Sequence, residues 1–233
     1  KPILSDGGIG TLLHQQGADF NTCFDYLNID NPALVADIHR AFIEAGSEII
    51  QTNTFGANRF KLQPHSLEDR VAEINKAGVD LARRAVLASF KDIFIAGSVG
   101  PLGVRLAPFG RVHLSEARDV FSEQIQALIK AQVDFLIIET MTDLIEIQQA
   151  ILAAKSIDSE IPMVASMTFT RDDRTLLGDS PAVVARTLSE AGIDAIGINC
   201  SAGPNQVLRI LKQMQQTAPG ANYSVMPNAG WPE

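Results

Sequence analysis

Seven short apolar or β-branched runs alternate with longer segments of helical periodicity, and this alternation limits the possible folds more than any other feature of the chain. A parallel sheet in which each strand is followed by a helix is the structure that this rhythm predicts. The predicted strands cover residues 3–5, 48–51, 93–96, 135–138, 163–166, 195–198 and 223–225.

Start and stop signals place two of the intervening helices. Residues 31–45 have apolar side chains at helical spacing behind Asn31-Pro32, and Gly46 follows as a stop signal. A second helix is predicted to begin near Ser180-Pro181 and to end at Ala191-Gly192.

The number of units favours a barrel. Seven βα-like units are one short of the eight that close a (β/α)8 TIM barrel, and the chain ends soon after the seventh, so we expect a barrel truncated before its eighth strand. An open doubly wound sheet is the competing fold, because it needs no closure. We find no linker or low-complexity tract and expect a single domain over residues 1–233.

Charge and composition exclude several classes of function. The net charge of −8 is spread along the chain without a basic stripe, which argues against nucleic-acid binding. The apolar runs are too short to cross a bilayer and the amino terminus lacks a signal-peptide pattern, so we expect a cytoplasmic protein. Only two cysteines occur, Cys23 and Cys200, too few for a disulfide framework.

Polar or small residues follow nearly every predicted strand. In a parallel barrel the carboxyl ends of the strands surround one mouth, so these residues are expected at a common site. Helix capping by Asn, Asp, Ser and Thr explains part of the pattern without any site. In strand order, the residues are Asp6-Gly7-Gly8, Thr52-Asn53-Thr54, Gly97-Ser98, Glu139-Thr140, Thr168, Asn199-Cys200 and Asn228.

Two acids stand out in this set. Glu139 directly follows a buried run, where an unpaired carboxylate is costly, so a cationic ligand group is the expected partner. Asp6 precedes glycines whose backbone N–H groups could receive an anion, and together these features suit an amino-acid substrate. The alternative for Asp6 is an N-cap of the helix beginning near Thr11.

Other familiar sites do not match. The third glycine of a dinucleotide fingerprint would fall at Leu13, and no Gly-Lys-Ser/Thr follows the glycines of residues 97–103. The four histidines share no metal-ligand spacing, and no predicted strand end presents the lysine that a Schiff-base enzyme requires.

Five stretches in register resemble the homocysteine S-methyltransferase family. The resemblance extends over essentially the whole chain, and the run from Cys23 to Pro32 is most similar to the homocysteine domain of methionine synthases and of bacterial fusions with methylenetetrahydrofolate reductase. The stretches are Asp6-Gly7-Gly8-Ile9-Gly10-Thr11, Gln51-Thr52-Asn53-Thr54-Phe55-Gly56-Ala57-Asn58, Gly97-Ser98-Val99-Gly100-Pro101, Ile138-Glu139-Thr140 and Gly197-Ile198-Asn199-Cys200.

The resemblance implies a zinc-dependent methyltransferase that acts on the sulfur of homocysteine and forms methionine. Cys200 matches one of the family's three zinc-binding cysteines. Asp6 and Glu139 become candidates for the substrate ammonium, and Asn199 for orienting metal or substrate. Gly7, Gly8 and Ser98 are candidates for the substrate carboxylate. Cys23 matches no ligand motif and is interpreted as structural.

The family's second ligand motif, Gly-Gly-Cys-Cys-Gly-Thr, does not occur in this sequence. One cysteine cannot build a tetrahedral zinc site, so we expect the chain to be part of a longer enzyme and to bind zinc poorly alone. The resemblance implies methyltetrahydrofolate or methylcobalamin as the methyl donor, bound by another domain or protein, while family members that use betaine or S-methylmethionine share this barrel. The alternative is a non-catalytic amino-acid-binding or scaffold module.

Overall fold

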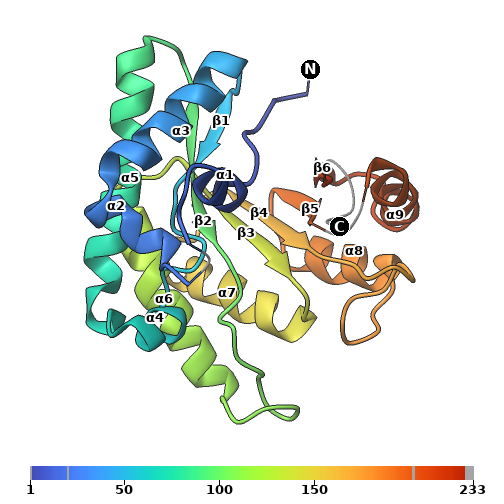
Figure 1. Ribbon diagram of the computed structural model, residues 1–233. Helices are drawn as coiled ribbons and strands as arrows, with labels where there is room; N and C mark the ends of the chain where they lie inside the picture. Colours follow the sequence, from blue (N-terminus) through green and yellow to red (C-terminus); the bar gives the residue numbers. More distant parts are fainter. Residues whose placement is uncertain (1, 20, 201–202, 229–233) are drawn as a thin grey trace. The chain divides into compact units, whose positions relative to one another are not determined.

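The structure has an α/β fold and was obtained as a computed structural model that describes residues 2–19, 21–200 and 203–228 (Figure 1). Residues 229–233, which follow the last predicted strand, lie outside this part. The chain forms two compact units, residues 1–104 with 119–136 and residues 105–118 with 137–233. A single domain over residues 1–233 stays a prediction.

The strands of the described residues form one six-stranded sheet in chain order. The pairs β1–β2, β4–β5 and β5–β6 are parallel, as the alternation of strand and helix predicts. The strands are β1 (Ile49–Gln51), β2 (Phe94–Val99), β3 (Phe135–Met141), β4 (Met163–Met167), β5 (Ala195–Asn199) and β6 (Asn222–Met226).

The prediction of a strand over residues 3–5 is wrong in its extent. Only Ser5 pairs with a neighbour, through an isolated parallel bridge to Ile49. Ile3 and Leu4 are 58% and 57% exposed, so this apolar run buries too little surface to form a full strand.

The first unit holds β1, β2 and the helices around them. Helices α3 and α5 pack along one another (Figure 1). The unit contains α1 (Ile9–Gln15), η1 (Phe24–Tyr26), α2 (Leu27–Asp30), α3 (Pro32–Ala45), α4 (Arg59–Leu62), η2 (Gln63–His65), η3 (Glu68–Arg70) and α5 (Val71–Ser89). Helix α6 (Leu114–Lys130) and strand β3 contribute residues to both units.

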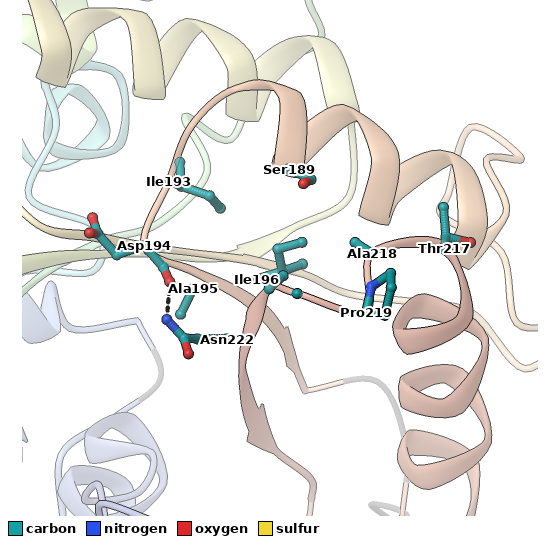
Figure 2. Close-up of a pocket in the computed structure, with 11 residues that line it drawn as sticks. Ser189, Ile193, Asp194, Ala195, Ile196, Thr217, Ala218, Pro219 and Asn222 are labelled. Carbon is teal, nitrogen blue, oxygen red and sulfur yellow. Dashed lines mark hydrogen bonds between the residues drawn. The ribbon is translucent and has the colours of Figure 1, made fainter.

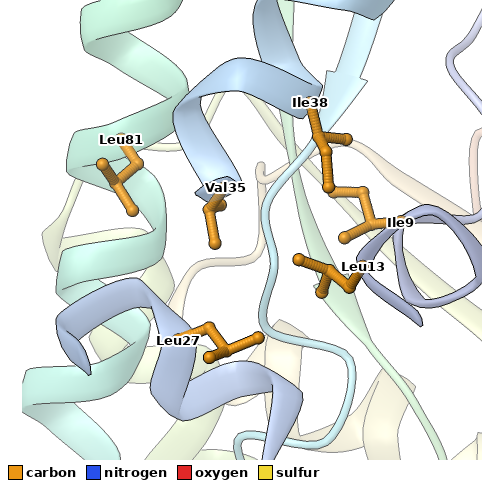
Figure 3. Close-up of a cluster of buried hydrophobic side chains, with 6 residues drawn as sticks. All are labelled: Ile9, Leu13, Leu27, Val35, Ile38 and Leu81. Atoms are coloured by element: carbon orange, nitrogen blue, oxygen red, sulfur yellow. The ribbon is translucent and has the colours of Figure 1, made fainter. Parts of the chain in front are cut away.

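A buried apolar cluster joins four helices of the first unit, α1, α2, α3 and α5. Figure 3 shows these side chains turned toward one another between the helices. The cluster consists of Ile9, Leu13, Leu27, Val35, Ile38 and Leu81. Burial of such side chains from separate segments is the main force that fixes α1 beside α3.

Capping signals in the sequence set the ends of α3 as predicted. The Asn31 side chain accepts a hydrogen bond from the Leu34 N–H, and Pro32 occupies the first helical position. Gly46 ends the helix with a φ of 105°, a left-handed conformation that a residue with a side chain adopts at a cost.

The second unit contains β4, β5, β6 and the helices α7 (Leu144–Ile157), α8 (Pro181–Glu190) and α9 (Pro204–Thr217). Helices α8 and α9 pack against each other (Figure 1). The Ser180 hydroxyl caps α8 by accepting from the Val183 N–H, in agreement with the predicted start of this helix.

At three places in the sheet, an acidic residue just before or at the start of a strand accepts a hydrogen bond from a backbone N–H of the segment beside it. The Asp134 carboxylate accepts from the Ile95 N–H at 2.6 Å, and the Asp194 carboxylate accepts from the Met163 N–H at 2.8 Å. Glu48 accepts from the Leu4 N–H at 3.1 Å. These bonds fix the amino ends of neighbouring strands.

No helix in the described ranges combines the length and apolar character needed to cross a bilayer. The longest, α5, carries charged residues throughout, among them Glu73, Lys76, Asp80 and Arg83.

Candidate functional site

Asp6 is held against the end of β1 in the first unit. Its N–H donates to the Ile49 carbonyl at 3.0 Å, and the residue is 5% exposed. Its carboxylate accepts from the Gln51 N–H at 2.8 Å and from Gln51 Nε2 at 3.1 Å, with the Ser5 hydroxyl a further donor at 3.2 Å. Neutral donors therefore hold the carboxylate in one orientation.

The N-cap alternative for Asp6 is wrong. Helix α1 begins at Ile9, its N-cap residue is Gly8, and no side chain caps it. Asp6 precedes that position and bonds to Gln51 instead. Gly7 and Gly8 connect Asp6 to the start of α1. Their contact with a substrate carboxylate remains a prediction.

Ser98 is buried near the carboxyl end of β2, where its backbone closes a cycle with two threonines. The Ser98 N–H donates to Thr52 Oγ1 at 3.1 Å, and Thr54 Oγ1 donates to the Ser98 carbonyl at 2.8 Å. Because the Thr54 proton is engaged there, Thr52 is the donor in the 2.6 Å bond between the two hydroxyls. Asp6 and Ser98 thus both contact segment 51–54 of the first unit.

In the second unit, Asn199 joins the other predicted site residues. Its Oδ1 accepts from the Thr140 N–H at 2.9 Å, and its Nδ2 donates to Thr140 Oγ1 at 2.8 Å. The same Nδ2 lies 3.3 Å from Glu139 Oε2 and 3.7 Å from Cys200 Sγ. The structure therefore brings Glu139, Asn199 and Cys200 together at the carboxyl ends of β3 and β5.

Two residues of this group have left-handed backbone conformations. The φ angles are 59° for Thr140 and 53° for Cys200, values that are strained for side chains with a Cβ and most unusual for a β-branched residue. The two hydrogen bonds between Asn199 and Thr140 hold Thr140 in this conformation. Such strain persists where surrounding contacts determine the conformation, which is frequent at functional sites.

Cys200 is exposed, with the Thr140 hydroxyl 4.0 Å from its sulfur. Desolvation of the thiol nevertheless raises its pKa, and the nearby Glu139 charge acts in the same direction, while bonds from Thr140 and Asn199 oppose the shift. Cys23 packs beside an apolar cluster of the first unit that includes Leu62 and Ile74, and burial raises the pKa of its thiol to about 11.

The described residues do not fit a complete zinc site by themselves. No group of three His, Cys, Asp or Glu side chains in the described ranges is placed to hold a metal ion. Cys200 is the only cysteine thiol among the described residues of the second unit. A tetrahedral catalytic zinc needs three protein ligands.

A separate cavity of about 510 Å³ lies in the second unit, at the amino ends of β5 and β6 (Figure 2). Its wall includes Ile193, Ile196 and Pro219, and Asn222 Nδ2 donates to the Asp194 carbonyl at 3.0 Å across one side. None of the predicted site residues lines it.

Sequence reasoning assigned no role to Gln51 or Thr140. Both belong to motifs that were recognised, and both lie at the carboxyl end of a strand. Their bonds join residues 45 and 59 positions apart, so only the three-dimensional pairing identifies the partners. The run of polar residues in segment 51–54 indicated that this strand end carries polar contacts, but not which residues they join.

Comparison with known proteins identifies relatives of the chain. Methionine synthase of Mycobacterium tuberculosis (strain ATCC 25618 / H37Rv) is 31% identical over 247 residues, and that of Mycobacterium leprae (strain TN) is 29% identical over 245. Both alignments cover 100% of this chain and 20% of the relative, so the chain spans about a fifth of their length.

Solved structures show the same fold. The metallated form of the homocysteine methyltransferase MmuM from Escherichia coli superposes with a TM-score of 0.76 at 21% identity, covering 99% of this chain and 93% of that one. The oxidized form gives the same TM-score. The family model described as homocysteine S-methyltransferase matches residues 3–233, and the chain therefore belongs to the homocysteine S-methyltransferase family.

Proposed function

We propose that this chain forms the homocysteine-binding part of an enzyme that transfers a methyl group to the sulfur of homocysteine and forms methionine. The observation that carries the proposal is the grouping of an exposed Cys200 with Glu139 and Asn199 at the strand ends of the second unit. Family membership and the names of the related methionine synthases support the same reaction.

We assign each charged group of the substrate to a different set of residues. Asp6 and Glu139 bind the homocysteine ammonium, since each is a carboxylate at the carboxyl end of a strand or bridge. Gly7, Gly8 and Ser98 receive its carboxylate. Asn199 orients Glu139, to which it donates a hydrogen bond.

We propose Cys200 as one ligand of a zinc ion, with the remaining ligands supplied by residues that this sequence does not contain. A bound zinc keeps a thiol in its nucleophilic thiolate form at neutral pH. The two cysteines of the sequence cannot complete such a site, which is why we assign the chain only one ligand. The same proposal takes the sheet as part of a (β/α)8 barrel.

The methyl donor is proposed to be methyltetrahydrofolate or methylcobalamin, bound by another domain or protein. The related methionine synthases are about five times longer than their aligned part, which leaves room for such domains in those proteins. We retain a cytoplasmic location as a prediction.

The decisive experiment compares two cysteine variants of the full-length protein that contains this chain. Methionine formation from homocysteine and zinc content are measured for Cys200→Ala and for Cys23→Ala, the matched control. We expect the Cys200 variant to lose activity by more than about 100-fold, together with its zinc, and the Cys23 variant to keep both. Full activity with normal zinc content in Cys200→Ala would refute the assignment.

A non-catalytic amino-acid-binding module is the second candidate. It is favoured by the lack of a three-residue metal group within the described ranges. Calorimetric titration with homocysteine, with and without added zinc, separates the two candidates. Affinity that does not depend on zinc favours the module, and affinity that requires zinc favours the enzyme.

A further inference from the structure

Gln51 contacts the Asp6 carboxylate twice, once from its backbone and once from its side chain. The backbone N–H donates to Oδ2 at 2.8 Å and the side-chain Nε2 donates to Oδ1 at 3.1 Å. One residue therefore bonds both carboxylate oxygens, and two donors at fixed spacing set the rotation of the carboxylate plane.

The backbone around this contact is itself fixed. The Asp6 N–H donates to the Ile49 carbonyl, and Gln51 is paired with Ala96 in the register of β1 and β2. Asp6 and Gln51 are each only 5% exposed. Since the carboxylate and its donors are buried together, water cannot replace the Gln51 amide without a rearrangement.

The second unit repeats the device. Asn199 is the last residue of β5, as Gln51 is the last residue of β1, and its Nδ2 donates to Glu139 Oε2 at 3.3 Å. Each carboxylate assigned to the substrate ammonium is thus bonded by an amide side chain at a strand end. A neutral amide orients a carboxylate without cancelling its charge, which suits a group that must bind a cation.

We propose that Gln51 is a positioning residue that orients Asp6 toward the ammonium group of an amino-acid substrate. This inference rests on the proposed function and deepens it. It names the side chain through which the protein would prefer a thiol substrate with an α-amino group over the same thiol acid without that group. Gln51 acts through Asp6 and contacts no reacting atom.

The test measures selectivity by calorimetry on the full-length protein that contains this chain, isolated with its metal. The probes are homocysteine and 4-mercaptobutanoate, which has the same thiol and carboxylate but no ammonium. Gln51→Met keeps the length of the side chain and the backbone donor and removes Nε2. We expect the preference for homocysteine to fall about tenfold in this variant, with the affinity for 4-mercaptobutanoate unchanged.

Two controls separate positioning from a structural role. Gln149→Met removes an amide that is equally buried, at 5% exposure, and that accepts hydrogen bonds from Arg118 in the second unit. It should leave the preference as in the wild type. In an Asp6→Asn background, Gln51→Met should cause no further loss, because the two residues act as one group.

The outcomes are distinct. An unchanged preference in Gln51→Met, or an equal loss in Gln149→Met, overturns the inference while the proposed function stands. A wild-type protein that binds neither probe overturns the proposed function and the inference with it. Should Gln51→Met fail to fold, Gln51→Asn keeps an amide that is one methylene too short to reach Oδ1, and the same loss of preference is expected.

Discussion

His39 makes the stability of the protein depend on pH in a way that its surroundings predict. The residue lies in α3 with no exposed surface, and neither ring nitrogen has a hydrogen-bond partner among the described residues. Burial lowers the pKa of the imidazole from 6.5 to about 4. As the pH falls, the unfolded chain binds this proton before the folded one does, so stability is full above pH 6.5 and declines toward pH 4.

The size of the effect follows from the shift. Each pH unit between the two pKa values costs about 1.4 kcal/mol, so moving from pH 7.5 to pH 5.0 removes about 2 kcal/mol of the free energy of unfolding. Asp25 acts in the opposite direction, because burial raises its pKa to about 6 and its charged form is disfavoured in the folded state at higher pH. The wild-type curve therefore mixes both groups.

The assay isolates His39 by difference. Urea unfolding followed by circular dichroism is recorded at pH 7.5 and 5.0 for the wild type, for His39→Leu and for His113→Gln, an exposed control. His39→Leu has similar volume and leaves no unpaired nitrogen, so it should be at least as stable at pH 7.5 and should lose about 2 kcal/mol less than the wild type on acidification. Parallel pH dependence of the wild type and His39→Leu would show that the imidazole is not buried as described.

Three further variants test hydrogen bonds and packing of the fold, each by urea unfolding. Thr54→Val removes the hydroxyl that donates to the Ser98 carbonyl and should cost about 2 kcal/mol, whereas an unchanged midpoint would contradict the closed cycle. A Cβ added at Gly100 would lie 2.5 Å from the Phe55 ring and 2.6 Å from its carbonyl oxygen, so Gly100→Ala should cost at least about 2 kcal/mol, and wild-type stability would exclude this contact. Asp194→Ala should cost about 1–2 kcal/mol and expose the amide at the start of β4 to hydrogen exchange, and retained protection of that amide would show that another acceptor serves it.

Local signals made most of the fold predictable. The bounds of α3 follow from Asn31, Pro32 and Gly46, which act on the backbone within a few residues of themselves. Six strands were found where apolar runs predicted them. The run at residues 3–5 was misjudged because its apolar residues suggest burial, whereas Ile3 and Leu4 are exposed and the pairing stops at Ser5.

The placement of Asp6, Glu139 and Cys200 at strand ends was predictable, but the contacts that orient these side chains were not. Glu139 was recognised because it directly follows a run of apolar residues, and Cys200 because Gly197-Ile198-Asn199-Cys200 resembles a family motif. The bonds of Gln51 to Asp6 and of Asn199 to Thr140 depend on the register of strands that are far apart in the chain. A single sequence contains no measure of that register, so these pairs could only be found in the structure.

The acids at the strand starts have a consequence for how the sheet is built. Glu48, Asp134 and Asp194 each bond to a segment that comes earlier in the chain, at separations of 44, 39 and 31 residues. Each bond can therefore form as soon as the acidic residue, which is the later partner in the chain, has left the ribosome. Because the entropy of loop closure grows slowly with length, all three closures have similar cost, and the sheet can grow strand by strand from its amino-terminal side.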